Sequence, residues 1–164
     1  MPVMASALSY VVDLKIRGGG MFVQHILNTK NNANLITVPL KTDLSEAISI
    51  LVAHKIGVVI VSETGKDALG ILSERDIIRA LSEAGTTALS APVEQFMSRH
   101  VVTCSPKTSA DDVLALMTEN RFRHMPVLEA GALIGLISQG DVIFARLQEI
   151  SMEKDALQGM IMGH

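Results

Sequence analysis

Two short stretches of the chain, Gly70-Ile71-Leu72-Ser73-Glu74-Arg75-Asp76 and Gly135-Leu136-Ile137-Ser138-Gln139-Gly140-Asp141, follow one pattern. In each, a glycine precedes two apolar residues and a serine, and an aspartate follows three residues after the serine. A pattern that recurs in the same order at a long interval indicates an internal duplication. The chain is therefore predicted to contain two copies of one structural unit.

The similarity extends to the N-terminal side of this motif. Residues 35–38 (LITV) match residues 101–104 (VVTC). A shorter stretch that precedes each copy also recurs, as residues 23–27 (VQHIL) and 93–97 (VEQFM). We name these two stretches the first and second lead-in segments. Their recurrence in the same order supports the duplication.

Hydrophobic patterning predicts the same three strands in both copies. Short runs rich in β-branched residues and bounded by turn residues are typical of strands. Gly65 and Gly131 stand in the turns between the last two strands of each copy. The predicted strands are residues 35–38, 58–61 and 68–72 in the first copy and 101–104, 125–128 and 133–137 in the second.

Two helices are predicted in each copy. Asp43, with Glu46 three residues later, forms a helix-start pattern, and Thr108 or Ser109 is expected to cap the second counterpart. A closing helix is predicted to begin near the motif aspartate of each copy. The resulting order, β-α-β-β-α, predicts an α+β fold with α/β-type layers.

The repeats divide the chain into five expected regions. An N-terminal extension, either flexible or the product of an upstream mis-start, is followed by a repeat, a linker, a second repeat and a C-terminal helix extension. Their predicted bounds are 1–21, 22–84, 85–92, 93–148 and 149–164.

The last helix is predicted to run from Asp141 to about Met162, which is longer than one repeat requires. Its apolar residues are spaced irregularly for a single stripe: Val142, Leu147, Ile150, Leu157 and Ile161. Because the far end needs something to pack on, a second subunit is the expected partner.

Composition excludes several classes of protein. Of 164 residues, 48% are hydrophobic, which excludes a disordered chain. Only 3% are aromatic and the net charge is -3, which argues against nucleic-acid and anionic-membrane binding.

No apolar run approaches the roughly 18–20 residues that span a bilayer, and no signal peptide is evident, so the cytoplasm is the expected location. One cysteine and five scattered histidines do not predict a metal site.

The paired β-α-β-β-α copies resemble the CBS-domain pair, also called a Bateman module. The motifs that carry this resemblance are the two glycine-serine-aspartate stretches and residues 121–127 (RFRHMPV), and the likeness covers about residues 22–148. The overall organisation looks like that of small stand-alone bacterial CBS-pair proteins. The resemblance implies two copies packed sheet to sheet about a pseudo-twofold axis, and a homodimer of such modules. It also implies clefts that bind an adenosine nucleotide, with AMP expected first and ADP, NAD or ATP as alternatives.

The first expected cleft combines Asp141, Ser138, Arg123 and His124. The Asp141 carboxylate can accept hydrogen bonds from both ribose hydroxyls, although a helix cap is its alternative role. Ser138 stands at a helix N-terminus, which favours anions. By the resemblance, Arg123 and His124 contact phosphate, and a guanidinium can do so with two hydrogen bonds. Arg121 is expected to be a solvated turn residue.

The first repeat is expected to supply the adenine slot of this cleft, with backbone groups near Thr37 contacting the edge of the base. An apolar lip for this slot is predicted from Ile56, Gly57 and Val58. The second, less favoured cleft is predicted from Asp76, Ser73, Arg75, Thr103 and Phe122.

These residues predict a non-catalytic sensor module that acts through an unidentified effector protein and requires no cofactor. The sequence has no G-x-S-x-G or phosphate-loop motif, so an enzyme is not predicted. The alternative is a structural oligomerisation module with vestigial clefts, because Gly57, Val58 and Gly140 replace polar residues of the other copy. Cys104 is expected to be a buried, unreactive thiol.

Overall fold

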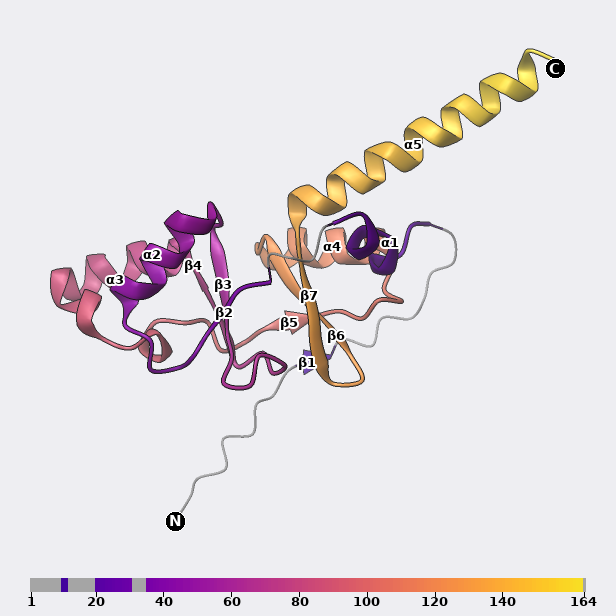
Figure 1. Cartoon of the computed structure of the whole chain (residues 1–164). Helices are drawn as coiled ribbons and strands as arrows, with labels where there is room; N and C mark the ends of the chain where they lie inside the picture. Colours follow the sequence, from indigo (N-terminus) through magenta and orange to yellow (C-terminus); the bar gives the residue numbers. More distant parts are fainter. Residues whose placement is uncertain (1–9, 12–19, 31–34, 164) are drawn as a thin grey trace.

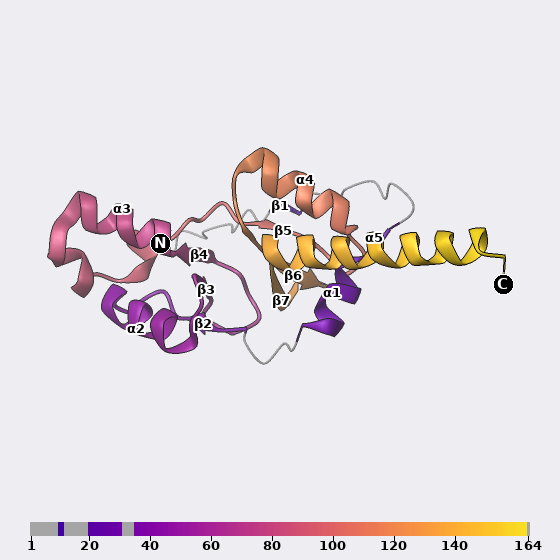
Figure 2. The same cartoon turned by 90° about the horizontal axis from the view of Figure 1, so that it is seen from above.

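The computed structural model describes residues 10–11, 20–30 and 35–163. Two lobes stand side by side, and the strands of both lie between the outer helices of the two lobes (Figures 1 and 2). Each lobe contains strands and helices in the order β-α-β-β-α. The predicted two-repeat α+β fold is thereby confirmed.

The first lobe is built on a three-stranded sheet with the order β2-β3-β4. β2 pairs with β3 in parallel and β3 pairs with β4 antiparallel. All four residues of β3 are buried, as expected for the central strand of a covered sheet. The elements are β2 (Thr37–Val38), α2 (Leu44–His54), β3 (Val58–Val61), β4 (Gly70–Ser73) and α3 (Glu74–Ala84).

The second lobe repeats this arrangement. β6 and β7 form an antiparallel pair, and a parallel bridge between Cys104 and Val127 joins the end of β5 to β6. The closing helix, α5, is much longer than α3. The elements are β5 (Val102–Thr103), α4 (Ala110–Asn120), β6 (His124–Glu129), β7 (Ala132–Ser138) and α5 (Gln139–Ile161).

Among the described residues, four short elements lie outside these two sets. β1 (Tyr10–Val11) pairs in parallel with β5. α1 (Val23–Thr29) contains the first lead-in segment, and the 3-10 helix η3 (Val93–Gln95) contains the first three residues of the second. The expected linker contains another 3-10 helix, η2 (Gly85–Ser90), whose Ala88 is buried in the first lobe. The linker is thus packed against the first lobe.

The lead-in segments are exchanged between the lobes. The first lead-in stands at the start of the first repeat in sequence, yet its apolar residues pack in the core of the second lobe, and the second lead-in packs in the core of the first. Each core is therefore completed by the segment that precedes the other repeat. The exchanged residues are Val23, Ile26 and Leu27 in one direction and Val93 and Met97 in the other.

Matching backbone hydrogen bonds accompany this exchange. The Val93 N–H donates to the Thr42 carbonyl over 2.8 Å, and the Val23 N–H donates to the Thr108 carbonyl over 2.9 Å. Thr42 and Thr108 occupy equivalent places in the two repeats. The two exchanges are thus related by the pseudo-twofold symmetry of the pair.

The same exchange determines how α2 and α4 begin. Asp43 precedes α2 but makes no side-chain cap, so the cap predicted from Asp43 and Glu46 does not form. Instead the free N–H of Leu44 donates to the carbonyl of Ala91, beside the second lead-in, over 2.9 Å. At α4, Ser109 accepts a hydrogen bond from the Asp112 N–H over 3.1 Å, which confirms the predicted cap.

Gly70, the motif glycine of the first repeat, makes room for the second lead-in. A Cβ atom on Gly70 would lie 2.5 Å from the Met97 Sδ and 3.1 Å from the Ser98 carbonyl oxygen. At this point Ile71 and Ser98 exchange two backbone hydrogen bonds of 3.0 and 2.8 Å. The glycine therefore allows the close approach that joins the second lead-in to β4.

We predict that Gly70→Ala lowers the free energy of unfolding by about 1–3 kcal/mol, because the added methyl group overpacks this contact. Gly159→Ala in α5 is the matched control, since a Cβ atom added there would have no other atom within 4 Å. Urea unfolding followed by circular dichroism compares the two. Equal stabilities of both variants would contradict the prediction.

Cys104 provides a second test of the packing. Its side chain is buried, and burial raises the pKa of the thiol to about 12. We predict that Cys104 reacts with iodoacetamide far more slowly in the native protein than in urea, because the thiolate is the reactive form. Mass spectrometry over time measures the rate, and rapid labelling of native protein would show that this core opens readily.

Candidate functional site

Two clefts lie where the repeats meet. The larger, cleft 1, has a volume of about 440 Å³, and the smaller, cleft 2, about 270 Å³. Gly57, Val58 and His124 line both clefts. Cleft 1 is also lined by Ile71, Ser73, Glu74, Arg75, Asp76, Arg79, Ser98, His100, Val101, Val102, Asn120, Arg121, Phe122 and Arg123, and cleft 2 by Lys30, Leu35, Ile36, Lys55, Ile56, Leu136 and Ser138.

Each cleft combines parts of both repeats. Cleft 1 joins the Ser73 motif to the turn before β6 in the second repeat, and cleft 2 joins Ser138 to the turn before β3 in the first. The expected grouping of Arg123 with Ser138, which belongs to the same repeat, is wrong. The structure instead places Arg123 in cleft 1 with Ser73 and Asp76. The reason is that the pseudo-twofold arrangement brings each motif to the other repeat's turn.

Some of the other predicted site residues line one of the two clefts, and the two threonines line neither. Ile56 lines cleft 2, and Arg75 and Phe122 line cleft 1. The two threonines, Thr37 and Thr103, are not among the lining residues: Thr103 is buried, and the residue before each threonine, Ile36 or Val102, lines the cleft instead. Successive side chains of a strand point to opposite faces, which accounts for this offset of one residue.

The two motif serines cap the helices that follow them. Ser73 accepts a hydrogen bond from the Asp76 N–H over 3.3 Å, and Ser138 accepts one from the Asp141 N–H over 3.1 Å. In return each aspartate accepts a hydrogen bond of 2.8 Å from the backbone N–H of its serine. The aspartates therefore have the capping role considered as their alternative, at the third helical position rather than at the cap itself.

Asp76 is buried and has a full set of hydrogen-bond donors. Its Oδ2 accepts from the backbone and the hydroxyl of Ser73, both over 2.8 Å. Its Oδ1 accepts from Arg79 over 2.5 Å and from the Ser98 hydroxyl over 3.3 Å. A carboxylate offers about four acceptor positions. A new hydroxyl group could therefore bind Asp76 only by displacing one of these donors.

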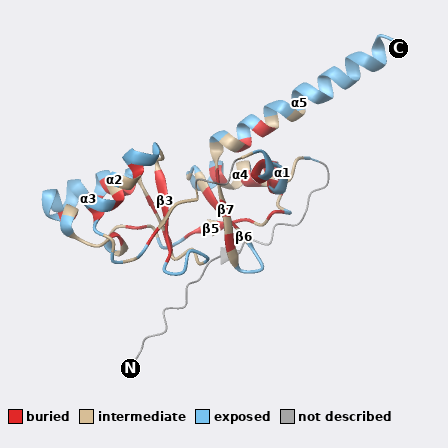
Figure 3. Cartoon of the chain, viewed as in Figure 1, coloured by how far each residue is buried: buried red, intermediate tan, exposed pale blue. Residues whose placement is uncertain are grey.

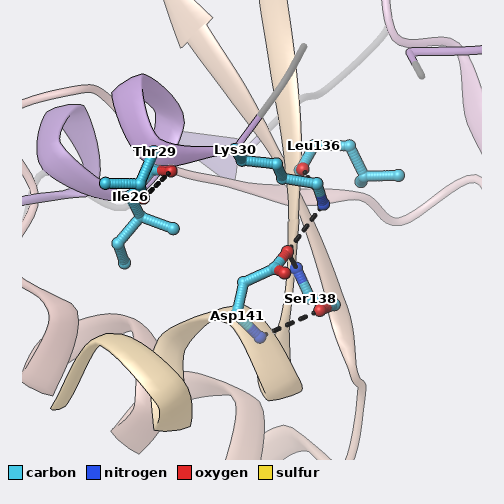
Figure 4. A network of polar contacts seen from close by, with 6 residues as sticks. All are labelled: Ile26, Thr29, Lys30, Leu136, Ser138 and Asp141. Carbon is cyan, nitrogen blue, oxygen red and sulfur yellow. Dashed lines mark hydrogen bonds and ion pairs between the residues drawn. The ribbon is translucent and has the colours of Figure 1, made fainter. Parts of the chain in front are cut away.

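Asp141 differs because its main partner is Lys30, at the end of α1 (Figure 4). The Lys30 Nζ lies 2.6 Å from Asp141 Oδ2 and also donates to the Leu136 carbonyl over 3.0 Å. Although burial tends to raise the pKa of Asp141, the hydrogen bonds from Lys30 and Ser138 lower it below its ordinary value. Lys30 lines cleft 2, and no repeated motif pointed to it in the sequence.

The charges around cleft 1 favour an anion. Four arginines and two carboxylates line it, in a chain whose net charge is -3. The N-terminus of α3 opens into the same cleft through Ser73 and Glu74, and helix N-termini attract negative charge. The sequence did not point to Arg79, and it favoured a solvated turn for Arg121. The arginines are Arg75, Arg79, Arg121 and Arg123.

His124 lies between the clefts and is half-buried. Burial lowers its pKa, and the positive charge of Lys30 adds to this effect, while Asp141 opposes it. The imidazole is therefore neutral near pH 7. A bound phosphate near His124 would favour its protonated form.

Two absences among the described residues bear on the kind of site. No group of three His, Cys, Asp or Glu side chains in residues 10–11, 20–30 and 35–163 is placed to hold a metal ion. Over the same residues, every helix is too short or too polar to cross a bilayer.

The Lys30–Asp141 pair yields a pH-dependent prediction. Its side chains are 32% and 28% exposed, so we expect Lys30→Met to lower the free energy of unfolding at pH 7 by about 1 kcal/mol. Because folding lowers the pKa of Asp141, the pair's contribution is present above the unfolded pKa of about 3.9 and is lost as the pH falls through the folded value. Parent and variant should thus converge in acid.

Urea unfolding between neutral pH and acid measures this difference. Lys55→Met is the control, since Lys55 lines the same cleft and forms no ion pair with the described residues. A constant difference between parent and Lys30→Met at every pH would show that Lys30 stabilises the fold by packing alone.

Comparison with known proteins adds independent information. A family model for the CBS domain matches the chain twice, over residues 23–83 and 93–148. A solved CBS-domain-containing protein from Agrobacterium tumefaciens is 40% identical, with a TM-score of 0.73, and the match covers 77% of this chain and 99% of that one.

Two other proteins are also similar to this chain. The mitochondrial CBS domain-containing protein CBSX3 of Arabidopsis thaliana is 32% identical over 122 residues, which is 72% of this chain and 59% of that protein. This chain therefore spans less than two thirds of that relative. The structure of CBSX2 in complex with AMP is 26% identical, with a TM-score of 0.68, and the match covers 79% of this chain and 98% of that one.

Proposed function

The chain belongs to the CBS-domain family, and from this premise we propose that it is a non-catalytic sensor that binds an adenosine nucleotide in cleft 1. The observation that carries the proposal is the gathering of four arginines around one cleft of an acidic protein. AMP is our first candidate, and the AMP complex of the related CBSX2 supports it. ADP, ATP and NAD are alternatives that share the same adenosine and phosphate chemistry.

The phosphate would bind at the arginine side of the cleft. Arg123 enters from the second repeat and Arg75 from the first, so one phosphate would be held by both repeats. Guanidinium groups bind phosphate with paired, charge-assisted hydrogen bonds. Arg75 and Arg123 have glycines at their equivalents, Gly140 and Gly57, which explains why we assign the phosphate to cleft 1 rather than cleft 2.

The nucleoside would lie against the apolar part of the cleft. Val58, Val102 and Phe122 offer the surface for an adenine ring. For Asp76 to accept the ribose hydroxyls, Arg79 would have to release Asp76 Oδ1. The Arg79 side chain is 54% exposed, so this exchange would disturb little packing and would free its guanidinium for the phosphate.

The output of such a sensor would depend on other molecules. A nucleotide that contacts both repeats would favour one arrangement of the lobes over another, which is how a ligand shifts a conformational equilibrium. We propose that an effector protein responds to this change and that the chain works as a homodimer. The cytoplasmic location and the domain bounds stay predictions.

Isothermal titration calorimetry with AMP, ADP, ATP, NAD and adenosine tests the proposal. We expect AMP to bind with micromolar to millimolar affinity and adenosine more weakly. A charge-assisted hydrogen bond contributes about 1.5–3 kcal/mol, so Arg123→Ala should weaken AMP binding roughly tenfold or more and leave adenosine nearly unchanged. Lys55→Ala in cleft 2 is the control and should retain AMP affinity.

Other results would point elsewhere. If no nucleotide binds at millimolar concentration, the structural oligomerisation module becomes the better hypothesis. If Lys55→Ala weakens AMP binding and Arg123→Ala does not, the nucleotide occupies cleft 2. Chromatography after incubation should recover the nucleotide unchanged, and its conversion would contradict a non-catalytic role.

A further inference from the structure

The distal part of α5 extends away from both lobes (Figures 1 and 2). Near its start Val142 and Ala145 are buried in the second lobe. From Ser151 to Gly163 every residue is exposed. Most of the helix is exposed (Figure 3), and large apolar side chains nevertheless occur along its whole length. Nothing in the described part of the chain covers them.

Five of these side chains form one regular stripe together with Lys154, whereas Phe144, Met152 and Met160 lie outside it. Its members are alternately four and three residues apart, which is the spacing of the a and d positions in a coiled coil. The irregular spacing inferred from the sequence arose because Val142, which packs in the lobe, was included and Ile143 was not. The stripe consists of Ile143, Leu147, Ile150, Lys154, Leu157 and Ile161.

The stripe is accessible to a second helix. Leu147 is 60% exposed and Leu157 is 60% exposed, so the lobe covers neither. At 3.6 residues per turn, the centre of the stripe lies about 130° around the helix from the side formed by Val142 and Ala145. Two copies of α5 could therefore meet along the stripe with their lobes directed outwards.

We propose that α5 pairs in parallel with α5 of a second copy of this chain. A seam of this period is complementary to a helix of the same period, and α5 is such a helix. In a parallel pair the two Lys154 side chains share one layer of the seam, and each lies beside Glu153 of the partner subunit, which has the opposite charge. In an antiparallel pair the two Glu153 side chains would face each other. A lysine at one a position also favours a defined register.

Sedimentation equilibrium of the full chain at micromolar to high micromolar concentrations tests the pairing. We expect Leu147→Glu combined with Ile150→Glu to weaken dimerisation roughly tenfold or more, because it places charges in the seam. Met152→Glu is the matched control, since Met152 is 68% exposed but lies outside the stripe. Lys154→Leu should strengthen the dimer, because the seam becomes fully apolar. Circular dichroism verifies that each variant is folded.

Orientation is tested with Ile161→Cys, because the native Cys104 is buried. A parallel pair brings the two introduced thiols together, so mild oxidation should give a disulfide-linked dimer. A parent chain that stays monomeric, or a double variant that dimerises as strongly as the parent, would overturn the proposal. Failure of Ile161→Cys to cross-link in a dimeric protein would overturn the parallel orientation.

Discussion

The exchange of lead-in segments is the interaction on which the rest of the structure depends. Neither core closes on its own residues, since Val23 seals the second lobe and Val93 seals the first. The exchange holds the repeats together at the level of their cores as well as at their surfaces. It also continues into the sites, because the chain that follows each lead-in contacts the motif aspartate of the other repeat. Ser98 reaches Asp76, and Lys30 reaches Asp141.

The two clefts are products of one duplicated plan that has diverged at a few positions. Arg75 and Arg123 make cleft 1 cationic, whereas their counterparts Gly140 and Gly57 carry no side chain. Cleft 2 obtains positive charge from Lys30, which enters with the exchanged first lead-in. The backbone plan is shared by the two copies while the chemistry is not. The pair therefore offers two sites with similar geometry and different preferences.

Much of the fold could be predicted because the information is local. The strands follow from runs of β-branched residues, and the closing helices follow from the serine and aspartate of each motif. What could not be predicted depends on which repeat a segment packs against. Sequence adjacency placed Arg123 with Ser138, but the pseudo-twofold arrangement places it opposite Ser73. Lys30 could not be predicted because it belongs to no repeated motif and reaches Asp141 only in the folded chain. The stripe of α5 could not be predicted because only the packed structure separates the buried Val142 from the exposed residues around it.

The exchange also bears on how such a protein can evolve. Once each half supplies a part of the other's interior, a single half is no longer a unit that can be inherited or transferred alone. A genetic event that moves this module into another protein has to carry both halves and both lead-ins. Within that constraint, the faces of the two clefts stay free to diverge, because the residues that distinguish them take no part in closing the cores. The duplication thus became permanent in its framework while it remained open to change at its sites.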